Sequence, residues 1–176
     1  MRYRLKIQLV VLLFCFNSLA YADPRWFQVE LIIFQQQSPS SELFEQTITE
    51  ISPIARYAQA SVGKKTLQNT YNKLDREKAY RPFYYQAWEI PVASGGVSLP
   101  IDVSQPDVDL NGWIKIQRGS LLHVIVDLEF SPASSDGVVY RLNEKRRVLF
   151  NELHYLDHPF FGAVVKVSPV EKESLQ

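Results

Sequence analysis

The chain has 176 residues, and its 19 lysine and arginine residues balance 19 aspartate and glutamate residues, so its formal net charge at pH 7 is zero. Nucleic-acid binding relies on clustered positive charge that neutralises phosphates, and no long basic run follows the first few residues, so the sequence argues against this class of partner. A single cysteine, Cys15, excludes an internal disulfide, and about 150 residues suffice for one hydrophobic core.

Residues 1–22 have the pattern of a secretory signal peptide. Three basic residues occur in MRYRLK, the apolar run IQLVVLLFCF follows, and small residues flank Tyr21 before the chain continues at Asp23. The apolar run is about half of the ~20 residues that a helix needs to span a bilayer. We expect cleavage after Ala22 and no stable transmembrane segment afterwards. A retained anchor and a lipoprotein processed at Cys15 are the alternatives.

The expected mature chain, residues 23–176, is mildly acidic, with 16 lysine and arginine residues against 19 acidic ones, and it contains no cysteine. In an oxidising compartment it therefore depends on its own core and not on disulfides. We expect a single domain.

The first half of this domain predicts one strand and two helices. Residues 26–34, WFQVELIIF, are apolar at both parities and predict a central strand that is buried on both faces. The polar loop QQQSPSS follows. Apolar residues at helical spacing predict one amphipathic helix over 41–51, which Pro53 stops, and a second over about 64–78.

The second half predicts consecutive strands. Alternating residues indicate a hairpin from LNGWIKI at Leu110 to LLHVIVDLEF at Leu121, with QRGS as its turn. The other strands are expected over 81–91, 97–103, an uninterrupted extended run from 138 to 156, and a returning strand from Gly162. Helices early and strands late predict an α+β fold, a mostly antiparallel sheet with two helices of the N-terminal half packed on one face.

The stretch ELHYLDHPFFG, residues 152–162, contains two of the three histidines. His154 and His158 are four residues apart, which on a helix would suit a metal site, but Pro159 and the alternating neighbours indicate an extended chain. On a strand the two histidines lie about 13 Å apart. We therefore expect a structural turn in which Asp157 and His158 hold the backbone around Pro159. A zinc-dependent hydrolase that uses His123 as a third ligand is the alternative.

Other charged residues allow further interpretations. Glu152, His154 and Arg146 share parity, which suits a general base or a buried polar tie. Asp127 and Glu129 are about 7 Å apart on one strand face, a spacing found in inverting glycosidases and also common on wet hairpin faces.

Arg146 and Arg147 point to opposite faces, so one of them is expected to tie to Glu152 or Asp157. Trp88 and Trp113 could stack on sugar rings or belong to the core. No serine or mature cysteine nucleophile motif is present.

Several stretches together resemble the CsiV family. They are the leader, the first strand WFQVELIIF, the aromatic strand YYQAWEIP, the hairpin LNGWIKIQRGSLLHVIVDLEF and the terminal stretch RRVLFNELHYLDHPFFGAVVKVSP. Trp26 stands where a tyrosine is expected, Ala87 replaces a longer residue, and the middle region is short.

The resemblance implies a periplasmic, non-enzymatic factor of cell-wall assembly in gamma-proteobacteria, without a cofactor. Implied partners are peptidoglycan and an outer-membrane lipoprotein of the LpoA type, which activates a class A penicillin-binding protein. The residues that match the family motif, and so form the candidate contact set, are Arg146, Arg147, Glu152, His154, Tyr155, Asp157, His158, Pro159 and Gly162.

Overall fold

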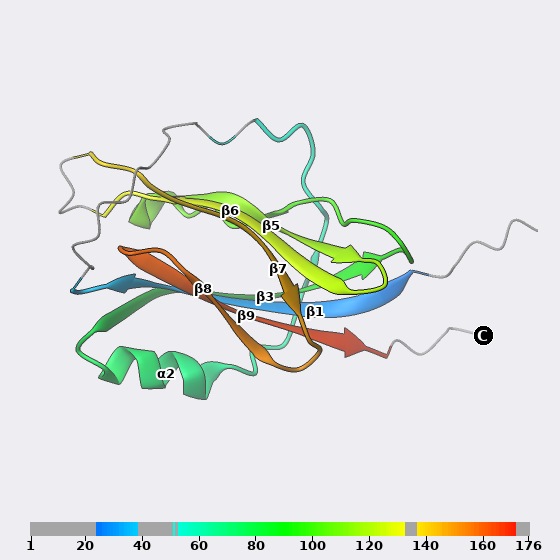
Figure 1. Cartoon of the computed structure of the whole chain (residues 1–176), viewed down its shortest axis with the longest axis horizontal. Helices are drawn as coiled ribbons and strands as arrows, with labels where there is room; N and C mark the ends of the chain where they lie inside the picture. Colours follow the sequence, from blue (N-terminus) through cyan, green and yellow to red (C-terminus); the bar gives the residue numbers. More distant parts are fainter. Residues whose placement is uncertain (1–23, 39–50, 52, 133–136, 172–176) are drawn as a thin grey trace, which may run out of the picture.

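A computed structural model describes residues 24–38, 51, 53–132 and 137–171, which form two stacked β-sheets with one helix on the outside (Figure 1). The predicted leader and, apart from Ile51, the predicted helix 41–51 lie outside the described residues. The strands are β1 (Arg25–Gln36), β2 (Ser61–Val62), β3 (Tyr80–Val92), β4 (Ile101–Asp102), β5 (Leu110–Arg118), β6 (Leu122–Phe130), β7 (Tyr140–Val148), β8 (Leu153–Asp157) and β9 (Phe161–Val170); the helices are α2 (Gln68–Arg76) and the short 3-10 helix η1 (Pro106–Val108).

Strand β1 lies in the middle of a five-stranded antiparallel sheet with the order β2-β3-β1-β9-β8. Its side chains at one parity, from Phe27 to Ile33, face the second sheet, whereas Ile32 and Phe34 face outward beneath α2. Since both faces are covered, both parities are apolar. The prediction of a central strand buried on both sides is confirmed.

The second sheet has four antiparallel strands in the order β4-β5-β6-β7. The predicted hairpin is its centre, because β5 pairs with β6 from Leu110 opposite Phe130 to Arg118 opposite Leu122. Val124, Val126 and Leu128, alternate residues of β6, are at most 1 % exposed and pack against the inner face of the five-stranded sheet. The two inner faces thus form one core.

The prediction of an α+β fold with mostly antiparallel strands is confirmed, but the strands form two stacked sheets and not the expected single sheet. The predicted second helix exists as α2, but a helix of nine residues covers only a small part of an apolar sheet face. The apolar inner faces of the two sheets are therefore buried against each other. The expected uninterrupted run over 138–156 is also wrong. It breaks at residues 149–152, where Asn151 has a φ of 62°, and there the chain passes from β7 in one sheet to β8 in the other.

Helix α2 is attached to the outer face of the five-stranded sheet by Glu30, a β1 side chain that is only 1 % exposed. The Glu30 carboxylate accepts hydrogen bonds from the backbone N–H groups of Thr66 (2.6 Å) and Leu67 (3.1 Å) and from the Tyr85 hydroxyl (2.8 Å). Burial alone would raise the pKa of Glu30, but hydrogen bonds from Thr66, Tyr85 and Leu67 outweigh it and lower the pKa. Glu30 therefore provides the anionic N-terminal cap that Leu67, at the cap position, cannot provide.

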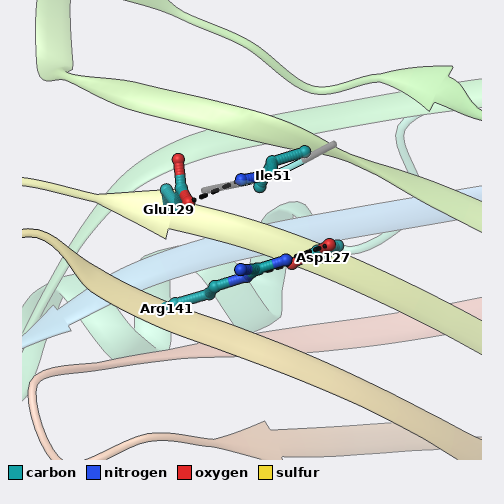
Figure 2. Close-up of polar contacts among 4 residues, drawn as sticks. All are labelled: Ile51, Asp127, Glu129 and Arg141. Atoms are coloured by element: carbon teal, nitrogen blue, oxygen red, sulfur yellow. Dashed lines mark hydrogen bonds and ion pairs between the residues drawn. The ribbon is translucent and has the colours of Figure 1, made fainter. Parts of the chain in front are cut away.

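The described part of the segment between β1 and α2 touches both sheets. The Ile51 N–H donates to Glu129 Oε1 (3.1 Å) on the outer face of the four-stranded sheet (Figure 2). The Ala58 N–H donates to the Pro100 carbonyl beside β4, and β2 then pairs with β3 in the other sheet.

In the described part of the chain, no helix has the length and apolar character needed to cross a membrane.

Candidate functional site

Three consecutive glutamines, Gln35, Gln36 and Gln37, mark one end of the sandwich, which we call the glutamine end. They continue β1 beyond its apolar part, and the Gln36 and Gln37 N–H groups donate to the carbonyls of Phe160 and Ala79. Side chains alternate along an extended chain. The Gln36 side chain accordingly joins a polar cluster on the outer face, while Gln35 and Gln37 line a pocket between the sheets.

The outer-face group is the Asp157 cluster, formed by Gln36, Tyr155 and Asp157. Asp157 Oδ1 accepts hydrogen bonds from the Tyr155 hydroxyl (2.6 Å) and from Gln36 Nε2 (3.0 Å), and the same amide reaches the His158 carbonyl (2.9 Å). Burial and then the bond to the Asp157 carboxylate raise the pKa of Tyr155, so the phenol stays protonated. The Tyr155 side chain remains 40 % exposed. A partly exposed ring beside a fixed carboxylate is suited to stacking on a sugar and accepting its hydroxyls.

Gly162 gives the Tyr155 ring its position. Tyr155 stacks on Phe34 with ring centroids 5.8 Å apart and planes at 13°. A Cβ atom on Gly162 would lie 2.8 Å from ring carbons of both residues. Only glycine therefore leaves room for the two rings at this point of β9.

Residues 158–160 form the turn between β8 and β9 that the sequence predicted. The His158 N–H donates to the Phe161 carbonyl (3.1 Å), and the Phe160 N–H donates to His158 Nδ1 (3.2 Å). His158 is 3 % exposed, and burial lowers its pKa more than the Asp157 charge raises it. Phe161 is fully buried, and Phe160 stacks on Tyr140 at 3.8 Å, so the turn is packed onto the sandwich and does not project as a free tip.

The three histidines lie in different places. His123 is on β6 in the four-stranded sheet, whereas His154 is on β8, where its Nε2 accepts a hydrogen bond from the Leu149 N–H (2.9 Å). In the described ranges, no three His, Cys, Asp or Glu side chains come together in an arrangement that could hold a metal ion. The zinc-hydrolase alternative gains no support from this geometry.

The two candidate glycosidase carboxylates have structural partners. The Arg141 guanidinium donates to both oxygens of Asp127 at 2.7 Å, and Glu129 accepts the Ile51 N–H (Figure 2). Asp127 is 4 % exposed, so its carboxylate is held by the arginine fork and is little accessible to a substrate.

The predicted arginine tie exists, but its partners differ from those expected. Arg146 Nε donates to Glu144 (2.6 Å), and another of its nitrogens donates to the Tyr155 carbonyl (2.5 Å), which joins β7 of one sheet to β8 of the other. The expected tie to Glu152 or Asp157 is therefore wrong. Arg147 is exposed and pairs with His123 across the two strands. Glu152 is exposed in the turn before β8, and the ring of His154 bonds to the Leu149 N–H and not to Glu152.

The two candidate tryptophans lie outside the glutamine end. Trp88 packs against the core beside Tyr84, with ring centroids 6.4 Å apart. Trp113 lies on the outer face of β5, with the Lys115 ammonium 4.2 Å from its ring centroid. Neither side chain lines the pocket or belongs to the Asp157 cluster.

A pocket of about 410 Å³, which we call the end pocket, opens between the two sheets at the glutamine end. Its lining residues are Gln35, Gln37, Arg81, Phe83, Asp107, Val108, Asp109, Phe130, Ser131 and Pro132. The five-stranded sheet supplies Arg81, whereas η1 and the residue after it supply Asp107 and Asp109. The volume is within the range of small-ligand sites.

The end pocket was not predicted from the sequence. QQQ was expected in a loop, although strand parity extended beyond Phe34 would have placed the first and third glutamines on the core side. Arg81, Asp107 and Asp109 are ordinary charged residues in the sequence, and only the alignment of the sheet ends brings them around one cavity.

The comparisons with known proteins give one match. Residues 54–170 match the family described as "Peptidoglycan-binding protein, CsiV". No curated protein and no solved structure is significantly similar to the chain. Because the match spans more than half of the sequence, the chain belongs to the CsiV family.

Proposed function

We propose that this protein is a non-enzymatic accessory factor of cell-wall assembly that binds peptidoglycan in the periplasm after its leader is cleaved behind Ala22. The family match over residues 54–170 carries the proposal, since the family is described as peptidoglycan-binding. Such a family suggests a periplasmic protein, because peptidoglycan lies in that compartment. Asp127 is held by Arg141 and Glu129 accepts the Ile51 N–H, and these structural contacts support a binding role over glycoside hydrolysis.

The glutamine end supports a location for the contact. The Asp157 cluster offers an exposed tyrosine ring beside a carboxylate that two hydrogen bonds hold in place, an arrangement that suits a sugar. Leu153, two residues before Tyr155 on the same face of β8, is 52 % exposed and extends this surface with apolar area.

Sedimentation with purified sacculi tests the proposal. The wild-type protein is expected in the pellet, and Asp157→Ala combined with Tyr155→Ala is expected to reduce the pelleted fraction several-fold while the circular dichroism spectrum stays unchanged. Asp75→Asn on the exposed side of α2 is the matched control and should pellet like the wild type. Absence of the wild-type protein from the pellet would reject peptidoglycan binding.

We further propose that the protein contacts an outer-membrane lipoprotein of the LpoA type through the exposed outer face of β8. Exposed Leu153 on that face supports a protein contact, because a large apolar side chain gains from burial in an interface. A pull-down with the purified lipoprotein should retain the wild type and lose Leu153→Ser. Equal retention of both would place the contact elsewhere, and no retention of either would reject the partner.

A further inference from the structure

We propose that the end pocket binds the zwitterionic end of a diamino acid in a peptidoglycan stem peptide, a carbon atom that bears both a free ammonium and a free carboxylate group. This inference rests on the proposed function and specifies which part of the polymer is recognised.

Opposite charges line the end pocket from a strand and from a turn. Arg81 comes from β3, and Asp107 and Asp109 come from the turn that carries η1 before β5. All three residues are exposed, and the ion pairs of the described residues, Asp127 with Arg141 and Glu144 with Arg146, do not include them. Their charges are thus available to a ligand that carries both signs.

The acidic side of the end pocket is held in place by the backbone. Asp109 has a left-handed conformation with a φ of 49°; its N–H donates to the Pro106 carbonyl (3.0 Å), and its carbonyl accepts the Ser131 N–H (3.1 Å). The backbone that carries the Asp109 carboxylate is thus already ordered, so an ammonium group entering the pocket requires ordering of the side chain and not of the loop.

The rest of the lining suits an aliphatic chain and peptide bonds. The Phe83 and Phe130 rings stack with centroids 4.5 Å apart and planes at 19°, and Val108 adds to this apolar part. Methylene groups gain by leaving water for such a surface. The Gln35 and Gln37 side chains line the same pocket and can both donate to and accept from amide groups.

These features distinguish a stem peptide from a sugar chain. A neutral sugar gains little from separated positive and negative groups, whereas a diaminopimelate end can place its carboxylate on the planar guanidinium of Arg81 and its ammonium on an aspartate. Cross-linking of the wall acylates this amine and removes its charge. The end pocket therefore selects stem peptides whose diamino acid has not been cross-linked.

Titration calorimetry with soluble fragments tests the inference. The probes are a disaccharide-tetrapeptide with a free diaminopimelate end, the same fragment after N-acetylation of that amine, and glycan strands freed of peptide by an amidase. The free-amine fragment is expected to bind at least tenfold more tightly than the acetylated one. Equal affinity for the two fragments, or lack of binding to either, would overturn the inference.

Variants connect the effect to the end pocket. Arg81→Gln and Asp107→Asn are each expected to weaken binding of the free-amine fragment to the level of the acetylated one, whereas Arg76→Gln and Asp75→Asn on α2 should not change it. Unchanged affinity in both pocket variants would overturn the location.

Sedimentation separates the two proposals. If the wild-type protein pellets with sacculi but binds the two fragments equally, only the stem-peptide inference fails. If the wild-type protein does not pellet, peptidoglycan binding fails as well.

Discussion

At position 162, the absence of a side chain leaves room for the stacked rings of Phe34 and Tyr155. Gly162→Ala would place a methyl group 2.8 Å from the rings of Phe34 and Tyr155, so we expect a loss of about 1–3 kcal/mol in the free energy of unfolding. Urea denaturation measures this loss. Because Tyr155→Ala removes one of the two clashing rings, the cost should be smaller in that background; an equal cost in both backgrounds would contradict the steric explanation.

His158 makes stability depend on pH in the mildly acidic range. Its pKa is lowered below the ordinary value of 6.5 by burial, so the unfolded chain binds the proton more readily than the folded one. The stabilising effect of neutral His158 is complete above about pH 6.5 and is lost as the pH falls through the lowered pKa. The free energy of unfolding should fall more steeply between pH 7 and pH 5 for the wild type than for His158→Gln, and parallel curves would disprove the assignment.

Among individual residues, the sequence predicted the turn around Pro159 but not the hydrogen-bond partners of Arg146. Alternation placed Arg146 and Arg147 on opposite faces, as observed, yet Arg146 bonds to Glu144 and to a carbonyl of β8 because the edges of two sheets lie side by side. A contact between sheets depends on their stacking, and no local pattern encodes it.

Among the elements, strand β1 is linked to the start of helix α2 by buried hydrogen bonds to Glu30. Glu30→Ala would leave the Thr66 N–H and the Tyr85 hydroxyl proton without their acceptor, whereas the Leu67 N–H would keep only the Tyr85 oxygen, and we expect a loss of about 3 kcal/mol. Chemical denaturation gives the total, and hydrogen exchange at residues 67–76 should accelerate more than exchange in β6. Uniform acceleration across both sheets would contradict a local role.

The hydrogen bonds of Glu30 make stability depend on pH in a more acidic range than His158 does. Since the pKa of Glu30 is lowered from its ordinary value of 4.5, its contribution is fully present above about pH 4.5 and is lost as the pH falls through the lowered pKa. The acid arm of the stability profile should therefore be flatter in Glu30→Gln than in the wild type.

Elements with strong periodicity were predicted well, and their ends and connections were not. The β5–β6 hairpin and α2 follow from alternation and from the apolar stripe of Leu67, Tyr71 and Leu74. The break at residues 149–152 was missed because LFNE carries no proline or glycine; its signal is Asn151, which tolerates the left-handed conformation found there.

For the whole molecule, the important contact is the one that joins the two sheets through Arg146. Arg146→Ala removes the bonds to Glu144 and to the Tyr155 carbonyl, and because the side chain is 42 % exposed we expect only about 1 kcal/mol of destabilisation. Arg147→Ala, at the neighbouring exposed position, should change stability by less than about 0.5 kcal/mol. Thermal unfolding of the two variants measures the difference, and equal melting temperatures would contradict the structural role of Arg146.

The sandwich itself follows from the number of apolar faces. Strand β1 is apolar at both parities and the β5–β6 hairpin at one. Within the described residues, helix α2 covers only part of this apolar area, and the two sheets bury the rest against each other. The sequence contained these faces, but the order of early helices and consecutive late strands led to the prediction of a single sheet.

The outer strands of the sandwich also protect the molecule from its own copies. On one side, β2 and β4 have two residues each; on the other, β8 has five, and β7 turns Glu144 and Arg146 inward and engages a carbonyl of β8. Strand addition in the manner of a growing fibril needs a long, flat and uncharged border. Strands β2, β4 and β8 lack the length and β7 lacks the neutral side chains, so these four strands are poor templates for the addition of a strand from a second copy.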